Sequence, residues 1–338
     1  MSLLQLKDNK QVLLIDRVGA GISQYYVKDQ NHRDIDVVLG YNNSDEKEAA
    51  QGDVLFPFPN RLESFAYEYD GKQYTISKQF INQVGKECVV FQDSNGHALH
   101  GFVRFEEWQV VIHTDTLLEL CFDTSNDYNY SLQGYPFHFK LIVRYELIDD
   151  TCGFTCSFVI ENPTSQAIPF GIGFHPYFSL TFRDEARPKM DEHLELTIHA
   201  DSMIEFDSHL RPTGKSINLN NDQFNQKRSM KGVVLDNCFT DLHFSNNTLL
   251  SKTLELQSSL TRKKLTLSQT SNMPYLQIYT YDHSEKNGRQ GVAIEPQTAA
   301  GFAFNIGKTA GLELLQPNAI FSGAFRITVD DGELRNNL

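Results

Sequence analysis

Hydrophobic and polar residues alternate over short stretches along most of the chain. The alternation has a period of two in segments such as 137–147, 153–161 and 264–269. Because every second side chain lies on the same face of a β-strand, each segment predicts a strand with one buried face. Turn-forming residues separate the segments, and Asp70-Gly71 between two such stretches predicts a tight hairpin turn.

The series of predicted strands is not interrupted by a long amphipathic helix pattern, an internal repeat or a low-complexity linker. The pattern therefore predicts an all-β protein, a large antiparallel sandwich of many short strands with few short helices. The chain of 338 residues exceeds the usual size of one domain. Since large all-β domains often exceed about 200 residues, we expect a single domain over residues 1–338.

Charge and hydropathy exclude several classes of function. A net charge of −13 argues against binding to nucleic acid or to an anionic membrane surface, and also against a strongly anionic substrate unless a local basic pocket exists. There is no apolar run of the roughly eighteen residues that a transmembrane helix needs. Polar residues follow Met1 too soon for a signal peptide.

The five cysteines, at positions 88, 121, 152, 156 and 238, form an odd and scattered set. Cys152 and Cys156 are four residues apart, but no matching pair elsewhere completes a zinc site. On a strand the two side chains would share one face, as small buried hydrophobic residues do. We therefore expect reduced thiols in a cytoplasmic protein, and no metal site.

Residues 171–178, Gly-Ile-Gly-Phe-His-Pro-Tyr-Phe, place one histidine among aromatic side chains. Pro176 disfavours the helical region for His175, so the imidazole should lie on extended chain. The two glycines allow another group to approach the backbone closely. These residues alone leave two interpretations of His175, an acid that points into a ligand-binding cleft or a hydrogen-bonded core histidine.

Three further charged residues are candidates for the same site. Pro57 and Pro59 force an extended, rigid segment that can present Asn60 and Arg61 to a ligand. Alternatively, Arg61 is part of a surface ion pair.

Glu295 follows Ala293 and Ile294 in an apolar strand, where a charge is expensive to bury unless it is paired. Burial beside a cationic partner at a functional site explains such a residue. Asp236 either binds a ligand hydroxyl or is a turn residue bonded to its own backbone. The remaining histidines, such as His32 and His193, lie in polar stretches and are expected on the surface.

Several of these segments resemble one known family in sequence and in order. The sequence is similar to the aldose 1-epimerase, or galactose mutarotase, family over essentially the whole chain. The matching segments are Phe56-Pro57-Phe58-Pro59-Asn60-Arg61, Leu99-His100-Gly101-Phe102, Gly173-Phe174-His175-Pro176-Tyr177-Phe178, Leu235-Asp236, Leu276-Gln277-Ile278-Tyr279-Thr280 and Ile294-Glu295-Pro296. Any one segment is weakly specific, but six in order are specific.

The resemblance implies a β-supersandwich fold, interconversion of the α and β anomers of free hexoses, and no metal or organic cofactor. It implies Glu295 as general base, His175 as general acid and His100 as a second histidine near the ring oxygen. The groups that it implies for binding sugar hydroxyls are Arg61, Asp236, Gln277 and, with Arg61, Asn60. The segment 181–232 does not align with sugar-contacting loops, which leaves the preferred sugar open.

Anomer exchange needs such an acid and base, because the C1 hydroxyl loses a proton while the ring oxygen gains one. We expect the Glu295 charge to raise the pKa of His175. The pH–rate profile is then bounded below by an acid resembling glutamate and above by one resembling histidine.

Two alternatives remain on the same fold. A hexose-6-phosphate 1-epimerase would need additional arginines or lysines at the cleft, and Arg61 is the only basic residue within the matched segments. A carbohydrate-binding protein without catalysis is the other alternative, although both His175 and Glu295 are present. Apart from a small sugar no partner is predicted, and the chain is expected to be a monomer or a homodimer.

Overall fold

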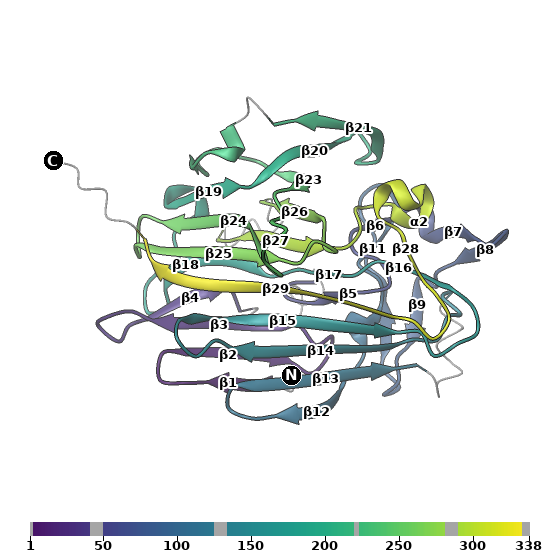
Figure 1. The fold of residues 1–338 in the computed structure, drawn as a ribbon, viewed down its shortest axis with the longest axis horizontal. Coiled ribbons are helices and arrows are strands. Elements are labelled where there is room, and N and C mark those ends of the chain that lie inside the picture. The colour runs from purple at the N-terminus through teal and green to yellow at the C-terminus, as the bar shows by residue number, and fades with distance from the viewer. Residues whose placement is uncertain (1–2, 41–49, 125–133, 220–222, 281–289, 333–338) are drawn as a thin grey trace.

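The structure is a computed structural model that describes residues 3–40, 50–124, 134–219, 223–280 and 290–332. Within these residues, two large sheets of twelve and nine strands lie against each other, and every strand pairing in them is antiparallel (Figure 1). The prediction of a large all-β antiparallel sandwich with few short helices is confirmed.

The larger sheet contains the strands that lie closest to the predicted site. In spatial order it consists of β1 (Leu3–Lys7), β2 (Gln11–Asp16), β3 (Ile22–Lys28), β4 (Asp34–Val38), β18 (Tyr177–Phe182), β27 (Val292–Gln297), β26 (Tyr275–Tyr279), β23 (Asp236–Leu242), β20 (Ala200–Phe206) and β21 (Pro212–Asn218). Two short strands, β5 (Val54–Leu55) and β17 (Gly173–Phe174), are attached to it beside β27.

The smaller of the two large sheets covers one face of this sheet. Its strands, in spatial order, are β12 (Gln109–His113), β13 (Leu117–Asp123), β14 (Lys140–Leu147), β15 (Cys152–Glu161), β29 (Ile320–Asp331), β25 (Lys263–Gln269), β24 (Ser251–Ser258), β19 (Leu194–Ile198) and β22 (Arg228–Ser229). Buried side chains from both sheets form one hydrophobic cluster that includes Trp108.

Short elements connect the sheets, and several of them gather at one end of the sandwich (Figure 1). The paired strands are β6 (Arg61–Leu62) with β11 (Ala98–Leu99), β7 (Ala66–Tyr69) with β8 (Lys72–Thr75), β9 (Gln79–Ile81) with β10 (Glu87–Val89), and β16 (Ile168–Phe170) with β28 (Glu313–Leu315). The helical elements are η1 (Glu63–Phe65), η2 (Val103–Phe105), η4 (Met190–Glu192), η5 (Gln223–Asn225), α2 (Ala303–Ile306) and η6 (Lys308–Ala310).

The period-two pattern corresponds to the burial of these strands. In β14, Leu141, Val143, Tyr145 and Leu147 are buried while the intervening side chains are more exposed. The Asp-Gly turn between β7 and β8 is a two-residue hairpin connection, with Tyr69 paired to Lys72. Both turn residues have positive φ, which is the conformation that such turns require.

All five cysteines are free thiols, and four of them are buried. Cys152 and Cys156 both lie on β15, as their spacing suggested. Among the residues that the structure describes, no helix has the length and apolar character needed to cross a membrane.

A buried ion pair involves Asp53, whose backbone is hydrogen-bonded to that of His175. The guanidinium Nε of Arg104 is 3.0 Å from Oδ2 of Asp53, and the two side chains are 2% and 0% exposed. The backbone N–H of His175 donates to the Asp53 carbonyl, and the Gly52 N–H donates to the His175 carbonyl. The ion pair therefore anchors the chain that holds the imidazole.

We expect Asp53→Ala to destabilise the fold by about 3–5 kcal/mol, because it removes the carboxylate that lies beside the buried Arg104 guanidinium. The matched control is Asp34→Ala, which breaks a Lys28–Asp34 pair whose side chains are 37% and 32% exposed. An exposed pair contributes less than about 1 kcal/mol. Urea unfolding of the two variants measures both values, and equal losses would contradict this account of the ion pair.

Candidate active site

Three predicted site residues lie on adjacent strands at one level of the larger sheet. Gln277 of β26 is paired with Glu295 of β27 on one side and with Cys238 of β23 on the other. Asp236 lies two residues before Cys238, so its side chain points to the same face of the sheet as Cys238 and Gln277. The sheet thus brings together three residues that are distant in the sequence.

His175 lies in the connection between β17 and β18, next to β27. Its Nε2 is 3.4 Å from Oε1 of Glu295, and the two residues are 4% and 2% exposed. The ring of Tyr177 stacks against the imidazole, with 5.2 Å between the ring centroids. The structure therefore brings the predicted acid and base into contact and out of bulk water.

His100 lies against His175, with 5.0 Å between the ring centroids. Its Nδ1 accepts a hydrogen bond from the Asn60 N–H at 3.3 Å, which leaves the ring proton on Nε2. Burial, the neighbouring His175 and the charges of Arg104 and Arg61 lower the pKa of His100 well below its ordinary value. His100 is therefore a neutral ring with one N–H available to a ligand.

Asn60 and His100 both have φ in the left-handed region, at 57° and 67°. Such conformations are uncommon for residues other than glycine and are concentrated at functional sites. The following residue, Gly101, also has positive φ, and a Cβ atom there would lie only 2.1 Å from the Phe56 carbonyl oxygen. Gly101 thus allows the His100 segment to pack against the proline-containing segment before Asn60.

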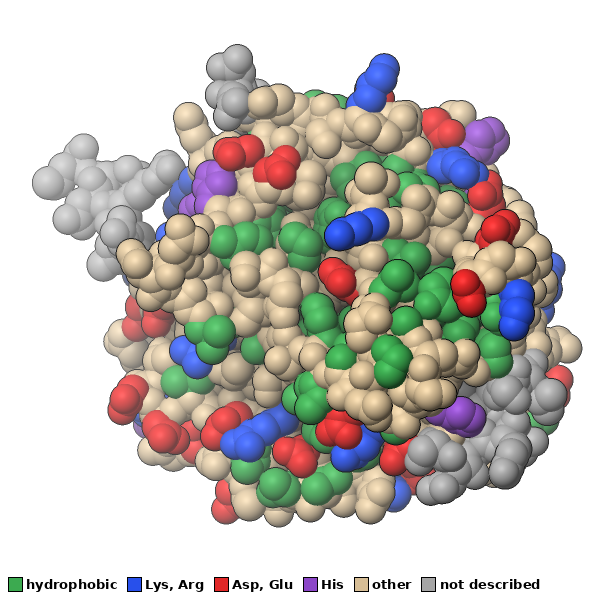
Figure 2. Space-filling model, turned by 45° about the vertical axis from the view of Figure 1, so that its right-hand side comes forward, with side chains coloured by type: hydrophobic (Ala, Val, Ile, Leu, Met, Phe, Trp, Pro, Cys, Tyr) green, Lys and Arg blue, Asp and Glu red, His purple; other side chains and the backbone are tan. Residues whose placement is uncertain are grey.

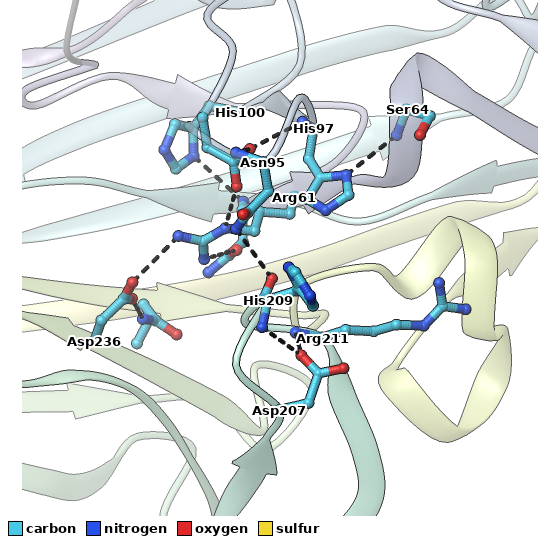
Figure 3. A network of polar contacts seen from close by, with 12 residues as sticks. Arg61, Ser64, Asn95, His97, His100, Asp207, His209, Arg211 and Asp236 are labelled. Atoms are coloured by element: carbon cyan, nitrogen blue, oxygen red, sulfur yellow. Dashed lines mark hydrogen bonds and ion pairs between the residues drawn. The ribbon is translucent and has the colours of Figure 1, made fainter.

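Arg61 connects the remaining predicted residues (Figure 3). Its guanidinium donates to Oδ2 of Asp93 at 2.9 Å, to Oδ1 of Asn60 at 3.1 Å and to Oδ2 of Asp236 at 3.2 Å. Oδ1 of Asp236 accepts a further bond from Nε2 of Gln277 at 2.7 Å. Arg61 is therefore in a largely buried network rather than a surface ion pair, and the Asp236 side chain bonds other side chains.

The sequence analysis missed two residues that contact this group. Gln297 donates from Nε2 to Oε2 of Glu295 at 2.9 Å. Its position two residues after Glu295 on the same strand could have revealed it, because such residues share a face. The partnership of Asp93 with Arg61 has no comparable signal, since Arg61 begins β6 and Asp93 lies in the loop before β11. The expectation that His193 is on the surface is wrong, because it is buried and bonded to Ser258.

The turn between β20 and β21 reaches the edge of the Arg61 network (Figure 3). It lies within the segment 181–232, for which the sequence resemblance gave no sugar-contacting loops. Asp207 holds the turn by accepting from the backbone N–H groups of His209 and Arg211. Nδ2 of Asn95 donates to the His209 carbonyl at 3.3 Å, and Arg211 forms an ion pair with Glu63. The turn therefore contacts Asn95 in the loop before β11 and Glu63 in η1, close to Arg61 in the network.

Three buried polar atoms near Glu295 have no hydrogen-bond partner within the described part of the chain. They are Nδ1 of His175, Oε1 of Gln277 and Oε1 of Gln297. Because more than about 90% of buried polar groups in proteins are hydrogen-bonded, their concentration around Glu295 indicates the place of a polar ligand. Two amide oxygens and an imidazole nitrogen suit a ligand that carries hydroxyl groups.

Burial dominates the electrostatics of the central pair. It raises the pKa of Glu295 well above its usual value, with the Asp236 charge adding to the effect and the Gln297 hydrogen bond and Arg61 opposing it. Burial lowers the pKa of His175 to about 3. The expectation of a raised His175 pKa is wrong, because removal of the imidazole from water lowers that pKa. The two shifts favour a protonated Glu295 carboxyl beside a neutral His175 imidazole.

No group of three or more histidine, cysteine, aspartate or glutamate side chains in the described ranges is arranged to hold a metal ion. Acidic and basic side chains are interspersed with hydrophobic ones on the face drawn in Figure 2. The charges of the site itself are paired through Arg61, so the site is polar without a strong local excess of either sign.

Solved structures share this architecture. An aldose epimerase homologue from Caenorhabditis elegans superposes with a TM-score of 0.79 at 20% identity, covering 98% of this chain and 99% of that one. A galactose 1-epimerase from Lactobacillus acidophilus gives a TM-score of 0.72 at 16% identity, covering 97% and 94%. At these identities the likeness shows the fold, which is of the galactose mutarotase-like class.

The sequence profile described as "Aldose 1-epimerase" matches residues 2–328, and the chain belongs to this family of isomerases. The protein YihR of Escherichia coli, of uncharacterised function, is 27% identical over 302 residues, which cover 88% of this chain and 83% of that protein. Human galactose mutarotase is 29% identical over 230 residues, covering 67% of this chain and 60% of the human protein. The resemblance seen in the sequence is confirmed.

We expect Glu295→Gln to raise the thermal unfolding midpoint at pH 8. A carboxyl whose folded pKa is raised stabilises the protein below its unfolded pKa of about 4.3, and this stabilisation is lost as pH rises through the folded pKa. Glutamine does not ionise, so the variant avoids this loss of stability. The increase in its unfolding midpoint should therefore be smaller at pH 4 than at pH 8. The measurement is circular dichroism melting at both pH values.

Glu255→Gln is the matched control. Although partial burial opposes the effect, Lys252 and Lys264 lower the pKa of Glu255 overall. That carboxylate therefore stabilises the fold above its unfolded pKa, and its replacement should lower the midpoint at pH 8. If both variants have a lower thermal unfolding midpoint than the parent protein at pH 8, burial does not raise the pKa of Glu295.

Proposed function

We propose that this protein interconverts the α and β anomers of a free hexose such as glucose or galactose. The observation that carries the proposal is the buried contact between Glu295 and His175, beside the hydrogen-bonded side chains of Arg61, Asp236 and Gln277. Membership of the aldose 1-epimerase family and the similarity to galactose mutarotases support it.

In the productive state Glu295 is ionised and His175 carries the proton. Glu295 takes the proton of the C1 hydroxyl, the C1–O5 bond breaks as C1=O forms, and His175 gives its proton to O5. Rotation about C1–C2 turns the other face of the carbonyl toward O5, and ring closure reverses both transfers. The site therefore ends each cycle with the protons that it had at the start.

The ring-opened state leaves Glu295 protonated and His175 neutral. This is the distribution that burial favours, since burial raises the Glu295 pKa and lowers that of His175. Stabilising the state that follows proton transfer lowers the barrier to reach it. His100 is neutral, so it can donate its Nε2–H to a sugar oxygen without repelling the proton on His175.

The hydroxyl-binding groups suit an uncharged sugar. Phosphate recognition commonly uses arginine in a bidentate geometry. Arg61 is already paired with Asp93 and Asp236, and Arg211 is paired with Glu63. These pairings favour a free hexose over a hexose 6-phosphate. A cytoplasmic location suits the five free thiols, and the chain is proposed to work as a monomer or homodimer without a cofactor.

We expect Glu295→Gln and His175→Asn to reduce the rate of anomer exchange by about 10²–10⁴-fold each, because each removes a positioned base or acid. Sugar binding should persist, since the other groups remain. Polarimetry on pure α-glucose and α-galactose measures the rate, and calorimetry measures binding. The control is His243→Asn, an exposed histidine paired with Asp201, which should retain full activity. Turnover that survives Glu295→Gln would exclude that residue as the base.

A comparison of substrates tests the preference for an uncharged sugar. We expect a higher kcat/KM for glucose than for glucose 6-phosphate, because the arginines near the network are paired with carboxylates. Polarimetry of both sugars under identical buffer and salt gives the ratio. A clear preference for the phosphate would replace the proposed substrate with the phosphorylated one.

A further inference from the structure

Gln297 is fully buried on β27, two residues after Glu295. Its Nε2 donates to Oε2 of Glu295 at 2.9 Å, while Oε1 of Glu295 is the oxygen that approaches His175. The two oxygens of the carboxyl group are therefore distinguished. One is held by a neutral amide, and the other is left for proton exchange.

The packing around Gln297 holds this amide in place. Gln297 is paired with Gly173 of β17 and with Tyr275 of β26. A Cβ atom at Gly173 would lie 2.9 Å from Cγ of Gln297 and 2.9 Å from Cβ of Pro59. The absence of a side chain at 173 thus creates the space into which Gln297 fits, with Pro59 on the other side.

We propose that Gln297 is a positioning residue, which orients the Glu295 carboxyl group and sets its affinity for the proton. The catalytic consequence rests on the proposed function, because it assumes that Glu295 is the base. A donated hydrogen bond stabilises the ionised carboxylate, which burial and the Asp236 charge both disfavour. A glutamine provides this donor without adding a charge to the site, as lysine or arginine would.

The test is Gln297→Met, which keeps the length of the side chain and removes the donor. The carboxyl of Glu295 should then bind its proton more tightly. Because the His175 pKa lies below that of Glu295, the alkaline limb of the kcat/KM profile is the one that Glu295 sets. We expect this limb to move to higher pH by about one unit and the plateau to fall about tenfold, with KM little changed.

Gln297→Glu is the second variant, because it has the same shape and fits the same space. It places a carboxyl group beside Glu295, and two carboxyl groups in contact raise the pKa of one of them. The limb should again move to higher pH. The matched control is Gln11→Met, since Gln11 is also buried and its Nε2 donates to a carboxylate, Oδ2 of Asp8 at 2.8 Å, on β2, four strands from β27 in the larger sheet. It should lower the thermal midpoint and leave the limb in place.

A second measurement does not depend on turnover. Infrared difference spectra against Glu295→Gln follow the carboxyl band of Glu295 as pH changes, in each variant. A band that titrates at higher pH in both Gln297 variants supports the inference. If that shift occurs in a protein without anomerase activity, the proposed function fails and the positioning role stands. If activity falls with neither the limb nor the band moving, Gln297 has only a structural role and the inference is overturned.

Discussion

A carboxyl group and an imidazole ring, both removed from water, lie 3.4 Å apart where the short strand β17 meets the centre of the larger sheet. The cost of burying charge controls the behaviour of this pair more than the attraction between opposite charges does. Burial shifts the two pKa values toward the neutral forms of both groups. The neighbouring groups counter this shift only in part, because Gln297 and Arg61 favour the ionised carboxylate while Asp236 opposes it.

The sandwich provides the environment that such a pair requires. This environment is a site shielded from water, to which several segments distant in the sequence contribute side chains. Adjacent strands fix Gln277 opposite Glu295, and the backbone of residues 52–53 brackets His175 through two hydrogen bonds. Asp53 of this segment also forms the buried ion pair with Arg104, so breaking that pair removes a carboxylate from beside a buried guanidinium. The layers therefore act as a rigid support for groups that must keep their distances within a fraction of an ångström.

The sequence predicted the strands well where one face is buried, because the period of two reports burial directly. It also indicated Glu295, since a charge between apolar neighbours needs a partner. The partners themselves were harder to predict. The contact of Arg61 with Asp93 and the approach of the 207–211 turn to Asn95 join segments that are distant in the sequence. The order of the two pKa values was predicted wrongly, because the degree of desolvation is a property of the packed structure and no local pattern encodes it.

The reversed pKa order changes how the site is understood. The productive form, with Glu295 ionised and His175 protonated, and the resting form, with the proton on Glu295, contain the same number of protons. Changing the pH therefore does not convert one into the other, and only their difference in free energy sets the productive fraction. Each group that stabilises the Glu295 carboxylate, such as Gln297, raises the fraction of the productive form. The same stabilisation reduces the free-energy preference for the proton distribution of the ring-opened state, in which Glu295 is protonated and His175 is neutral. The surroundings of Glu295 consequently balance two requirements. The carboxyl group must be ionised often enough to accept a proton from the closed sugar, and it must be stable in its protonated form beside the ring-opened sugar.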